Sequence, residues 1–448
     1  MLHLTSLNLN QRMQKLSTIT LGCSKNKVDT EHILSQVEDL FEIVPEGEDI
    51  PVDVLLINTC GFIGDAKEES VQAVLEAVAR KQAGEVGKVI VFGCLSQRYM
   101  HELPDLIPEV DAWFGAREFD PVIRELGGTP SEEKRVERYL TTPSHYAYLK
   151  ISEGCDRRCS YCAIPFIRGA HKSVPMEKLV AEAERLAAKG VKELIIIAQD
   201  TTYYGLDLYR RRALAELLQK LSEVEGIEWI RIHYSYPAAF PDDVLDQMAE
   251  NPKVCRYMDI PLQHISDKVL DNMHRNVTGS WTRDLIKRMR ERVPGVVLRT
   301  TMIVGHPGEG KKDFEELLSF VEEARFERLG AFRYSEEEGT YGAENFKDSI
   351  SARVKQERLD ALMTRQSEIS LAFNQSRVGS EIKVIVDDFN DGVLVCRSEL
   401  ESPEVDGEIL VKYDSSVEVD PYSLIGEFIT VKVIGADEYD LIAEVVEI

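Results

Sequence analysis

The sequence contains no apolar run that approaches the ~20 residues needed to cross a bilayer, and residues 1–17 have neither the basic head nor the apolar centre of a signal peptide. It also has no internal repeat and no low-complexity segment. With 44% apolar residues in a chain of 448, there is ample material for several buried cores. We therefore expect a cytoplasmic, globular protein of about three domains with no membrane partner.

Positive charge is scarce, since 53 basic residues stand against 78 acidic ones and the net charge is −25. Affinity for nucleic acids comes largely from lysine and arginine side chains that displace counterions, so this balance argues against a nucleic acid as the main substrate. A basic protein partner fits the sign of the charge better. The eight cysteines, in a reducing cytosol, indicate metal ligands, reactive thiols or core residues rather than disulfides.

The first third of the chain predicts a doubly wound parallel α/β domain over residues 14–130. Three short apolar runs, at 18–23, 52–60 and 87–94, read as strands, and the amphipathic segment 65–82 reads as a helix between two of them. Each of these strands ends in a cysteine: Cys23, Cys60 and Cys94. Parallel strands point the same way, so we expect the three thiols at the carboxyl edge of the sheet, where such sheets bind ligands. Any one of them could be a core residue, but three at strand ends indicate a shared site.

After a polar connector at 128–144, a longer alternation of strands and helices predicts a second domain over residues 141–370. Six strand-like runs, from HYAYLKISEGC to RLGAFRYS, alternate with helical segments that include 176–189, 212–224 and 311–324. Six such units predict a partial (β/α)6 barrel similar to a TIM barrel, with its active site at the carboxyl ends of the strands.

From about Leu371 the helical period disappears, and short β-rich runs separated by glycine and acidic turns predict a small all-β barrel over residues 371–448. This segment has 5 basic and 18 acidic residues, a net charge of −13. This negative charge either marks a surface that binds a basic partner or belongs to a solvent-exposed face without a partner.

The sharpest motif is GCDRRCSYCAIPFIRG, in which Cys155, Cys159 and Cys162 have the spacing C-x3-C-x2-C directly after the first barrel strand. Zinc sites usually need four ligands, whereas three thiolates in one tight loop suit an iron-sulfur cluster with one open iron. A zinc knuckle or a loop without a ligand is the alternative.

With this motif at the start of a βα barrel, the chain resembles the radical S-adenosylmethionine superfamily. The resemblance implies that the open iron binds the amino and carboxylate groups of S-adenosylmethionine, whose reductive cleavage releases a 5′-deoxyadenosyl radical. Tyr161 matches the aromatic position of the family motif, which implies that it packs over the cluster.

The three N-terminal cysteines, the radical loop and the terminal barrel together resemble the methylthiotransferases over essentially the whole chain. This resemblance implies a second 4Fe-4S cluster on Cys23, Cys60 and Cys94, which carries sulfur, and it implies that the terminal barrel is a TRAM-like, OB-like domain. It also implies two molecules of S-adenosylmethionine, one as methyl donor and one as radical source, and a reducing electron donor such as flavodoxin.

Two branches of this family differ in substrate, an adenosine in tRNA or the β-carbon of an aspartate in small-subunit ribosomal protein twelve. The segments LGCSKNKVDTE and MDIPLQHISDKVLDNMHR, and His264 after the glutamine, are more similar to the ribosomal-protein branch. The acidic terminal barrel favours the same substrate, because ribosomal proteins are basic. The alternatives are the same chemistry on tRNA and, in another class, a non-catalytic iron-sulfur or zinc protein that uses the barrel for interaction.

Two positions depart from the family pattern: Val174 stands where an arginine is common, and Ser24 replaces the usual proline beside Cys23. Neither change removes a cluster ligand, although the loss of the arginine puts an anion contact in doubt.

Polar residues at barrel strand ends, with two glycines of the segment IVGHPGE, are the candidates for the S-adenosylmethionine pocket. The glycines would permit close approach of a ribose or adenine, although a simple strand-to-helix turn explains them equally well. The candidates are Gln199, Asp200, Arg299, Thr301, Gly305 and Gly308. Arg299 and Gln263 could instead contact a substrate carboxylate.

The remaining thiols and imidazoles receive ordinary roles. Cys255 and Cys396 stand apart from the other cysteines and are expected in the core. His233, His264 and His306 lie near strand ends, where packing or hydrogen bonding is the expected role. The starting residue is either Met1 or Met13.

Overall fold

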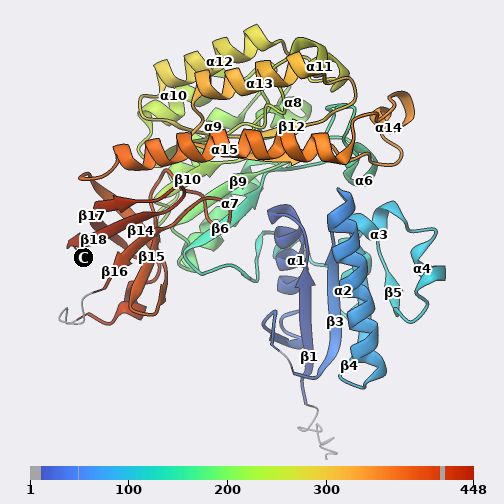
Figure 1. The fold of residues 1–448 in the computed structure, drawn as a ribbon. Helices are drawn as coiled ribbons and strands as arrows, with labels where there is room; N and C mark the ends of the chain where they lie inside the picture. The colour runs from blue at the N-terminus through green and yellow to red at the C-terminus, as the bar shows by residue number, and fades with distance from the viewer. Residues whose placement is uncertain (1–11, 49, 414–418, 448) are drawn as a thin grey trace, which may run out of the picture. The chain divides into compact units, whose positions relative to one another are not determined.

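The computed structural model describes residues 12–48, 50–413 and 419–447, so Met1 lies outside the described residues. The described residues form two compact units (Figure 1): unit 1 comprises those up to residue 141 together with 166–168, and unit 2 comprises residues 142–165 and those from 169 onward. Within the described ranges, no helix combines the length and the apolar character that a membrane crossing requires.

Unit 1 is built on a five-stranded parallel sheet with the order β2-β1-β3-β4-β5. Its strands are β1 (Gln14–Thr20), β2 (Phe41–Val44), β3 (Val52–Thr59), β4 (Val86–Gly93) and β5 (Ala112–Trp113). Its helices are α1 (Ser24–Val37), α2 (Gly64–Gln82), α3 (Cys94–Arg98), α4 (Leu103–Leu106) and α5 (Phe119–Glu125), followed by a 3-10 turn at Glu133–Val136. The strands expected at 52–60 and 87–94 are confirmed as β3 and β4. The strand expected at 18–23 is present as β1, but it begins at Gln14 and ends at Thr20. The short edge strands β2 and β5 were not anticipated.

The sheet of unit 1 is buried on both faces, which explains why β3 is almost continuously apolar. Leu56 points to a core shared with Ile33 and Leu34 of α1. The neighbouring Leu55 points to the opposite core, which includes Val74 of α2. Helices therefore cover both faces, and the predicted doubly wound α/β domain is confirmed.

Unit 2 contains a six-stranded parallel sheet with the order β13-β12-β11-β10-β9-β6, which is the predicted partial barrel. The strands are β6 (Tyr146–Lys150), β9 (Glu193–Ile197), β10 (Trp229–Ile232), β11 (Val254–Asp259), β12 (Val297–Val304) and β13 (Arg328–Arg333). A small pair, β7 (Ser152–Glu153) and β8 (Lys172–Ser173), flanks the cysteine loop. All six predicted strands are present.

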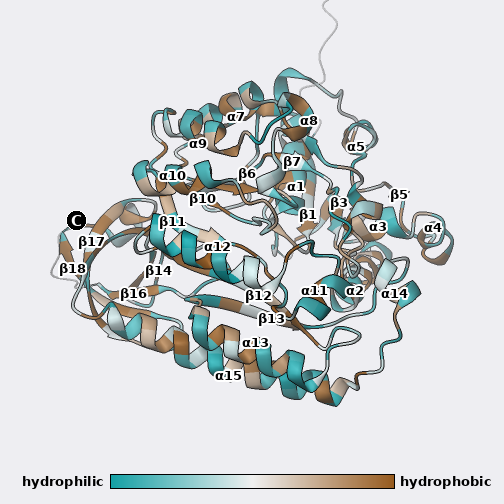
Figure 2. Ribbon diagram, turned by 90° about the horizontal axis from the view of Figure 1, so that it is seen from above, coloured by the Kyte–Doolittle hydropathy of each residue, from teal (hydrophilic) through white to brown (hydrophobic). Residues whose placement is uncertain are grey.

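Helices connect the strands of the partial barrel, and those expected at 176–189, 212–224 and 311–324 are observed as α7, α9 and α13. The α-helices from the cysteine loop onward are α6 (Ile164–Arg168), α7 (Met176–Ala188), α8 (Leu206–Tyr209), α9 (Leu214–Ser222), α10 (Asp242–Glu250), α11 (Asp267–Asn272), α12 (Gly279–Arg292), α13 (Lys311–Ala324), α14 (Tyr341–Asn345) and α15 (Ala352–Ser376). Hydrophilic and hydrophobic residues alternate along α15 (Figure 2), whose Leu362 and Ile369 are buried.

The expected end of helical structure near Leu371 is wrong, because α15 continues to Ser376 and the first strand of the terminal barrel begins at Glu381. Polar residues such as Ser370 and Asn374 interrupt the apolar period there, yet both are buried and hydrogen-bonded to Arg328. The closed barrel itself is confirmed. Its strands are β14 (Glu381–Asn390), β15 (Val393–Arg397), β16 (Ile409–Lys412), β17 (Phe428–Ala436) and β18 (Leu441–Glu447), in the order β14-β15-β16-β18-β17.

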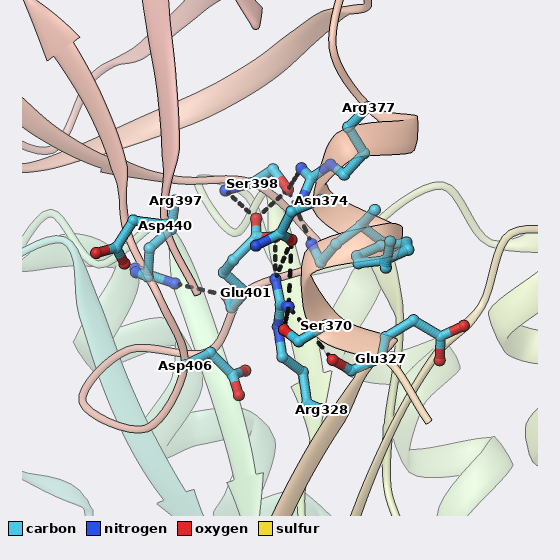
Figure 3. Close-up of polar contacts among 12 residues, drawn as sticks. Glu327, Arg328, Ser370, Asn374, Arg377, Arg397, Ser398, Glu401, Asp406 and Asp440 are labelled. Carbon is cyan, nitrogen blue, oxygen red and sulfur yellow. Dashed lines mark hydrogen bonds and ion pairs between the residues drawn. The ribbon is translucent and has the colours of Figure 1, made fainter. Parts of the chain in front are cut away.

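The terminal barrel packs against the amino ends of the central strands. The Trp229 ring, at the start of β10, lies 4.8 Å from the Phe428 ring of β17. Glu193, the first residue of β9, pairs with Arg397 of β15 at 2.8 Å. Glu401 of the loop after β15 pairs with Arg328, the first residue of β13, at 3.2 Å (Figure 3). The carboxyl ends of the central strands therefore face away from this attachment.

Candidate functional site

Three thiols of unit 1 lie at the carboxyl edge of the parallel sheet. Cys23 directly precedes α1, Cys60 directly follows β3, and Cys94 begins α3 after β4. Because β1, β3 and β4 are neighbours in the sheet, their ends converge, as expected from the parallel order.

A glycine adjoins each of these cysteines and lets the three loops approach closely. A Cβ atom on Gly22 would lie 2.8 Å from Cys60 Sγ, and a Cβ atom on Gly61 would lie 2.8 Å from the carbonyl carbon of Cys94. Any larger residue at these two positions would push the loops apart. These glycines were not predicted as part of the site, although the pairs GC, CG and GC are visible in the sequence.

A buried arginine contacts the same group of thiols. Arg168 belongs to residues 166–168 of unit 1 and is 1% exposed. Its Nε donates to Cys94 Sγ at 3.3 Å, and its Nη1 pairs with Asp29 at 2.7 Å. Asn26 accepts a further hydrogen bond from Arg168 and donates to the Thr59 carbonyl at 3.2 Å, which ties the end of β3 to α1.

Burial and charge act in opposite directions on the three thiols. Burial raises the pKa of Cys60 to about 11 and raises the pKa of Cys94. Desolvation would also raise the pKa of Cys23, but the positive charges of Lys25 and Arg168 outweigh it and lower this pKa. Thiols with raised pKa values keep their protons until a metal displaces them, so metal binding here would release protons.

The second group of thiols lies in one loop of unit 2, between β7 and α6. The amide of Cys162 donates to the Cys159 carbonyl at 3.1 Å, and the amide of Cys155 donates to the Gly169 carbonyl at 3.0 Å. The amide of Arg157 donates to Cys155 Sγ at 3.4 Å. Burial raises the pKa of Cys155 to about 12 and raises that of Cys162.

Aromatic and positively charged side chains lie beside Cys159. Arg275 Nη1 donates to Cys159 Sγ at 3.5 Å and to the Tyr161 hydroxyl at 3.3 Å. The Tyr236 hydroxyl lies 3.8 Å from Cys159 Sγ and donates to the Arg275 carbonyl at 2.8 Å. The guanidinium groups of Arg275 and Arg157 lie 4.2 and 4.1 Å from the centre of the Tyr236 ring. Sequence reasoning singled out Tyr161 but neither Tyr236 nor Arg275.

Neither group of thiols is arranged for a single metal ion. Across residues 12–48, 50–413 and 419–447, no three histidine, cysteine or acidic side chains converge as such an ion requires. In an iron-sulfur cubane each thiolate binds a different iron, so a group of three thiols fits a cluster with one iron left open.

Polar atoms without a hydrogen-bond partner lie near the carboxyl ends of the central strands, in Gln199, which was predicted to bind the cofactor, in Gln263, which was predicted to bind the substrate, and in Arg275, which was not predicted. Buried oxygen atoms of Gln199 and Gln263, both Oε1, have no hydrogen-bond partner among the described residues, and the same holds for Arg275 Nε. Gln263 has a positive φ of 74°, and its backbone pairs with Thr301 and Ile303 of β12. Orphaned buried polar atoms at this edge fit a polar ligand such as S-adenosylmethionine.

Two of the predicted cofactor residues already have partners within the protein. Asp200 is buried and pairs with Arg157 Nε at 2.8 Å. Arg299 Nη1 donates to Asp259 at 2.9 Å, and Arg299 Nε lies 3.7 Å from Asp406 of the loop that follows β15. Arg299 therefore joins the partial barrel to the terminal barrel, a role that the sequence analysis did not foresee.

The glycines of the IVGHPGE segment are required by the protein itself. Gly305 has a φ of +77°, and a Cβ atom there would lie 2.4 Å from Lys355 Cγ of α15. Gly308 has a φ of +91°, and a Cβ atom there would lie 2.6 Å from Asn272 Nδ2. The turn needs both glycines whether or not a ligand approaches them.

The remaining thiols and imidazoles lie in packed surroundings. Cys255 packs with Trp229, and Cys396 lies in the core of the terminal barrel. His233 Nε2 lies 2.9 Å from Ser402 Oγ. Burial lowers the pKa of His264 to about 3 and that of His306 to about 4, so both are neutral at physiological pH.

Comparison with known proteins adds three family models and closely similar relatives. Residues 149–321 match the Radical SAM superfamily, residues 15–115 match the Uncharacterized protein family UPF0004, and residues 378–446 match the TRAM domain. The chain is 50% identical over 431 residues to the ribosomal protein uS12 methylthiotransferase RimO of Phocaeicola vulgatus, covering 96% of this chain and 99% of that protein. It is also 50% identical over 437 residues to RimO of Porphyromonas gingivalis, covering 97% of this chain and all (100%) of that protein.

Among solved structures, the fold is similar to that of the radical S-adenosylmethionine methyltransferase TsrM from Kitasatospora setae with cobalamin and a 4Fe-4S cluster bound. The TM-score is 0.53 at 13% identity, over 93% of this chain and 85% of that chain. At this identity the likeness concerns the fold alone. Identity near 50% over nearly the full length, by contrast, decides the family: the chain belongs to the radical S-adenosylmethionine methylthiotransferases of the RimO family.

Proposed function

We propose that the protein transfers a methylthio group to the β-carbon of an aspartate in ribosomal protein uS12. The observation that carries this proposal is the identity of about half of all residues, over nearly the whole chain, with proteins named ribosomal protein uS12 methylthiotransferase. The net charge of the chain, −25, argues against the alternative substrate, an adenosine in tRNA, because nucleic-acid binding depends largely on positive charge.

The six cysteines at the two sites have separate tasks in this proposal. Cys155, Cys159 and Cys162 would hold the cluster at which S-adenosylmethionine binds and is cleaved, while Cys23, Cys60 and Cys94 would hold a second 4Fe-4S cluster that carries sulfur. When bound, the first cluster supplies one electron to S-adenosylmethionine. A reducing protein such as flavodoxin would then return one electron to the cluster. Gln199 and Gln263 would orient the bound S-adenosylmethionine through their unpaired oxygens.

The overall exchange replaces one carbon–hydrogen bond of the aspartate by a carbon–sulfur bond. The hydrogen atom leaves with the deoxyadenosyl group as 5′-deoxyadenosine, and methionine is released with it. The sulfur comes from the N-terminal site, and the methyl group comes from a second molecule of S-adenosylmethionine, which leaves S-adenosylhomocysteine. Formation of the carbon–sulfur bond releases one electron, which the iron held at the N-terminal site would accept. A β-carbon–hydrogen bond beside a carboxylate cannot be removed by a side-chain base at neutral pH, so a radical route is chemically reasonable. Burial lowers the pKa of His264 to about 3 and that of His306 to about 4, so neither imidazole is a strong base.

An acidic groove on unit 2 supports a basic partner. It has a volume of about 730 Å³ and includes the exposed side chains of Asp388, Glu404 and Glu408 beside Tyr146. Desolvation raises the pKa of Glu408, because it disfavours the charged carboxylate. The neighbouring carboxylates of Asp440, Asp387 and Asp388 raise this pKa further by repulsion. A lysine or arginine of a ribosomal protein placed there would relieve this repulsion.

The proposal is tested by adding uS12, S-adenosylmethionine and a reductant to the iron-loaded protein and measuring the intact mass of uS12, followed by fragmentation. The expected gain is one carbon, two hydrogens and one sulfur on a single aspartate. Cys155→Ala should abolish both this gain and 5′-deoxyadenosine formation, whereas Cys23→Ala should abolish the gain but retain 5′-deoxyadenosine. Cys255→Ala, in the packed core, is the matched control and should retain both.

Two results would contradict the proposal. If uS12 keeps its mass while tRNA gains methylthiolated adenosine, the substrate is wrong. If the iron-loaded protein never forms 5′-deoxyadenosine, the protein is a non-catalytic metal-binding protein.

A further inference from the structure

Arg275 differs from every other buried arginine in the described part of the chain, because no carboxylate pairs with it. It is 4% exposed, and among the described residues its side chain donates to Cys159 Sγ, the Tyr161 hydroxyl and the Pro261 carbonyl. Each of the other buried arginines forms an ion pair with an aspartate or glutamate; they are Arg138, Arg168, Arg231, Arg328, Arg377 and Arg397.

A buried guanidinium without an anion is costly, because desolvation of the charge is then not offset by a partner. Arg275 Nε has no hydrogen-bond partner at all among the described residues. The surrounding structure nevertheless holds the side chain in place: Tyr236 stacks at 4.2 Å, and its hydroxyl binds the Arg275 carbonyl at 2.8 Å. The flanking residues His274 and Asn276 both have positive φ values, 55° and 53°, so the backbone is strained at this point.

A cluster bound by the cysteine loop would supply the missing anion, because Arg275 Nη1 donates to Cys159 Sγ at 3.5 Å. Three thiolates carry more negative charge than an oxidised 4Fe-4S core carries positive charge, so a cluster at Cys155, Cys159 and Cys162 is an anion. One-electron reduction adds another negative charge. A fixed cation that donates to a ligand sulfur stabilises the reduced form more than the oxidised form, which raises the reduction potential.

We propose that Arg275 is the built-in counter-ion of the cluster held by the C-x3-C-x2-C loop and sets its reduction potential through the hydrogen bond to Cys159. Arg275 would act through Cys159 and not on the substrate, so it is a positioning residue. This assignment rests on the proposed function, which places a cluster in that loop. Arg157, which also lies over the Tyr236 ring, does not share the role, because its Nε pairs with Asp200 at 2.8 Å.

The test is an electron paramagnetic resonance redox titration of the iron-loaded full chain without S-adenosylmethionine. Removing the N-terminal thiols leaves one cluster to titrate, so the background carries Cys23→Ala, Cys60→Ala and Cys94→Ala. In this background Arg275→Gln should lower the reduced-to-oxidised ratio at a fixed potential at least tenfold, equivalent to about 59 mV for one electron. Arg275→Lys keeps the charge and should lower the ratio less than threefold. Arg211→Gln, which removes a charge from an exposed surface pair, is the control and should change nothing.

The outcomes separate the inference from the function on which it rests. An unchanged midpoint in Arg275→Gln with full iron content overturns the inference, and so does loss of iron from both Arg275 variants, since lysine retains the cation. Loss of iron from the glutamine variant alone supports it. Failure of the background protein with an intact Arg275 to bind iron would instead contradict the proposed cluster in the loop.

Discussion

Replacing Glu401 by glutamine tests whether buried charge holds the terminal barrel to the central sheet. Glu401 is 1% exposed, and its carboxylate pairs with Arg377 and, at 3.2 Å, with Arg328 (Figure 3). The Ser398 amide also donates to this carboxylate at 3.2 Å. Glutamine has nearly the same shape but no charge, so the two guanidinium groups would stay buried without a carboxylate.

The magnitude follows from the pKa of this group. Burial alone would raise the pKa of Glu401, but Arg377 and Arg328 outweigh it and lower the pKa from 4.5 to about 2. A pKa difference of about 2.5, at ~1.36 kcal/mol for each unit, corresponds to ~3 kcal/mol of stability at neutral pH. Because the pKa is lower in the folded state, this contribution is fully present above pH 4.5 and is lost as the pH falls through about 2.

The assay uses Trp229, which is 6% exposed and lies 4.8 Å from Phe428 of the terminal barrel, as a fluorescent reporter of the attachment. The other two tryptophans are removed by Trp113→Phe and Trp281→Phe. Urea unfolding of Glu401→Gln in this background at pH 7 should give a free energy of unfolding ~3 kcal/mol lower than that of the parent. The difference should shrink to about half by pH 3.

The matched control is Glu357→Gln, which removes a carboxylate from the exposed i,i+4 pair with Arg353. This substitution should change the free energy of unfolding by less than ~0.5 kcal/mol. A change below ~1 kcal/mol for Glu401→Gln at pH 7, or a difference that does not depend on pH, would refute the reasoning.

Three further variants test other parts of the structure. Gly305→Ala should lower the free energy of unfolding by about 1–3 kcal/mol in the same Trp229 assay, because the residue has a φ of +77° and faces Lys355; an unchanged value would mean that the turn can relax. Cys396→Ala should cost about 1 kcal/mol but leave iron content unchanged, and iron loss measured by ferrozine would show that this core thiol matters for a cluster. The double variant Asp388→Lys and Glu408→Lys should raise the KM for uS12 at low salt without lowering kcat; equal KM values at low salt would exclude the groove of about 730 Å³ as a docking surface.

The sequence predicted the strands and the placement of the N-terminal thiols because both depend on local patterns. A strand buried on two faces needs a continuous apolar run, as in Val52–Thr59, and parallel order then fixes the edge at which Cys60 emerges. The edge strands Phe41–Val44 and Ala112–Trp113 escaped prediction because four and two residues are too short for a period. The end of the helix Ala352–Ser376 was placed too early because its last turns bury polar groups that hydrogen-bond to distant residues.

The arginines show where a pattern of residue types stops being informative. Arg299, chosen for its position near a strand end, pairs with Asp259 and Asp406, while Arg168 and Arg275, which the sequence analysis passed over, donate to cysteine sulfurs. Their sulfur partners lie 74 and 116 positions away in the chain, so no local spacing marks them. What separates Arg275 from Arg168 is a carboxylate, Asp29, that accompanies only the latter. A missing counter-charge is a property of three-dimensional surroundings, and it becomes visible only when every charged neighbour of a buried group is known.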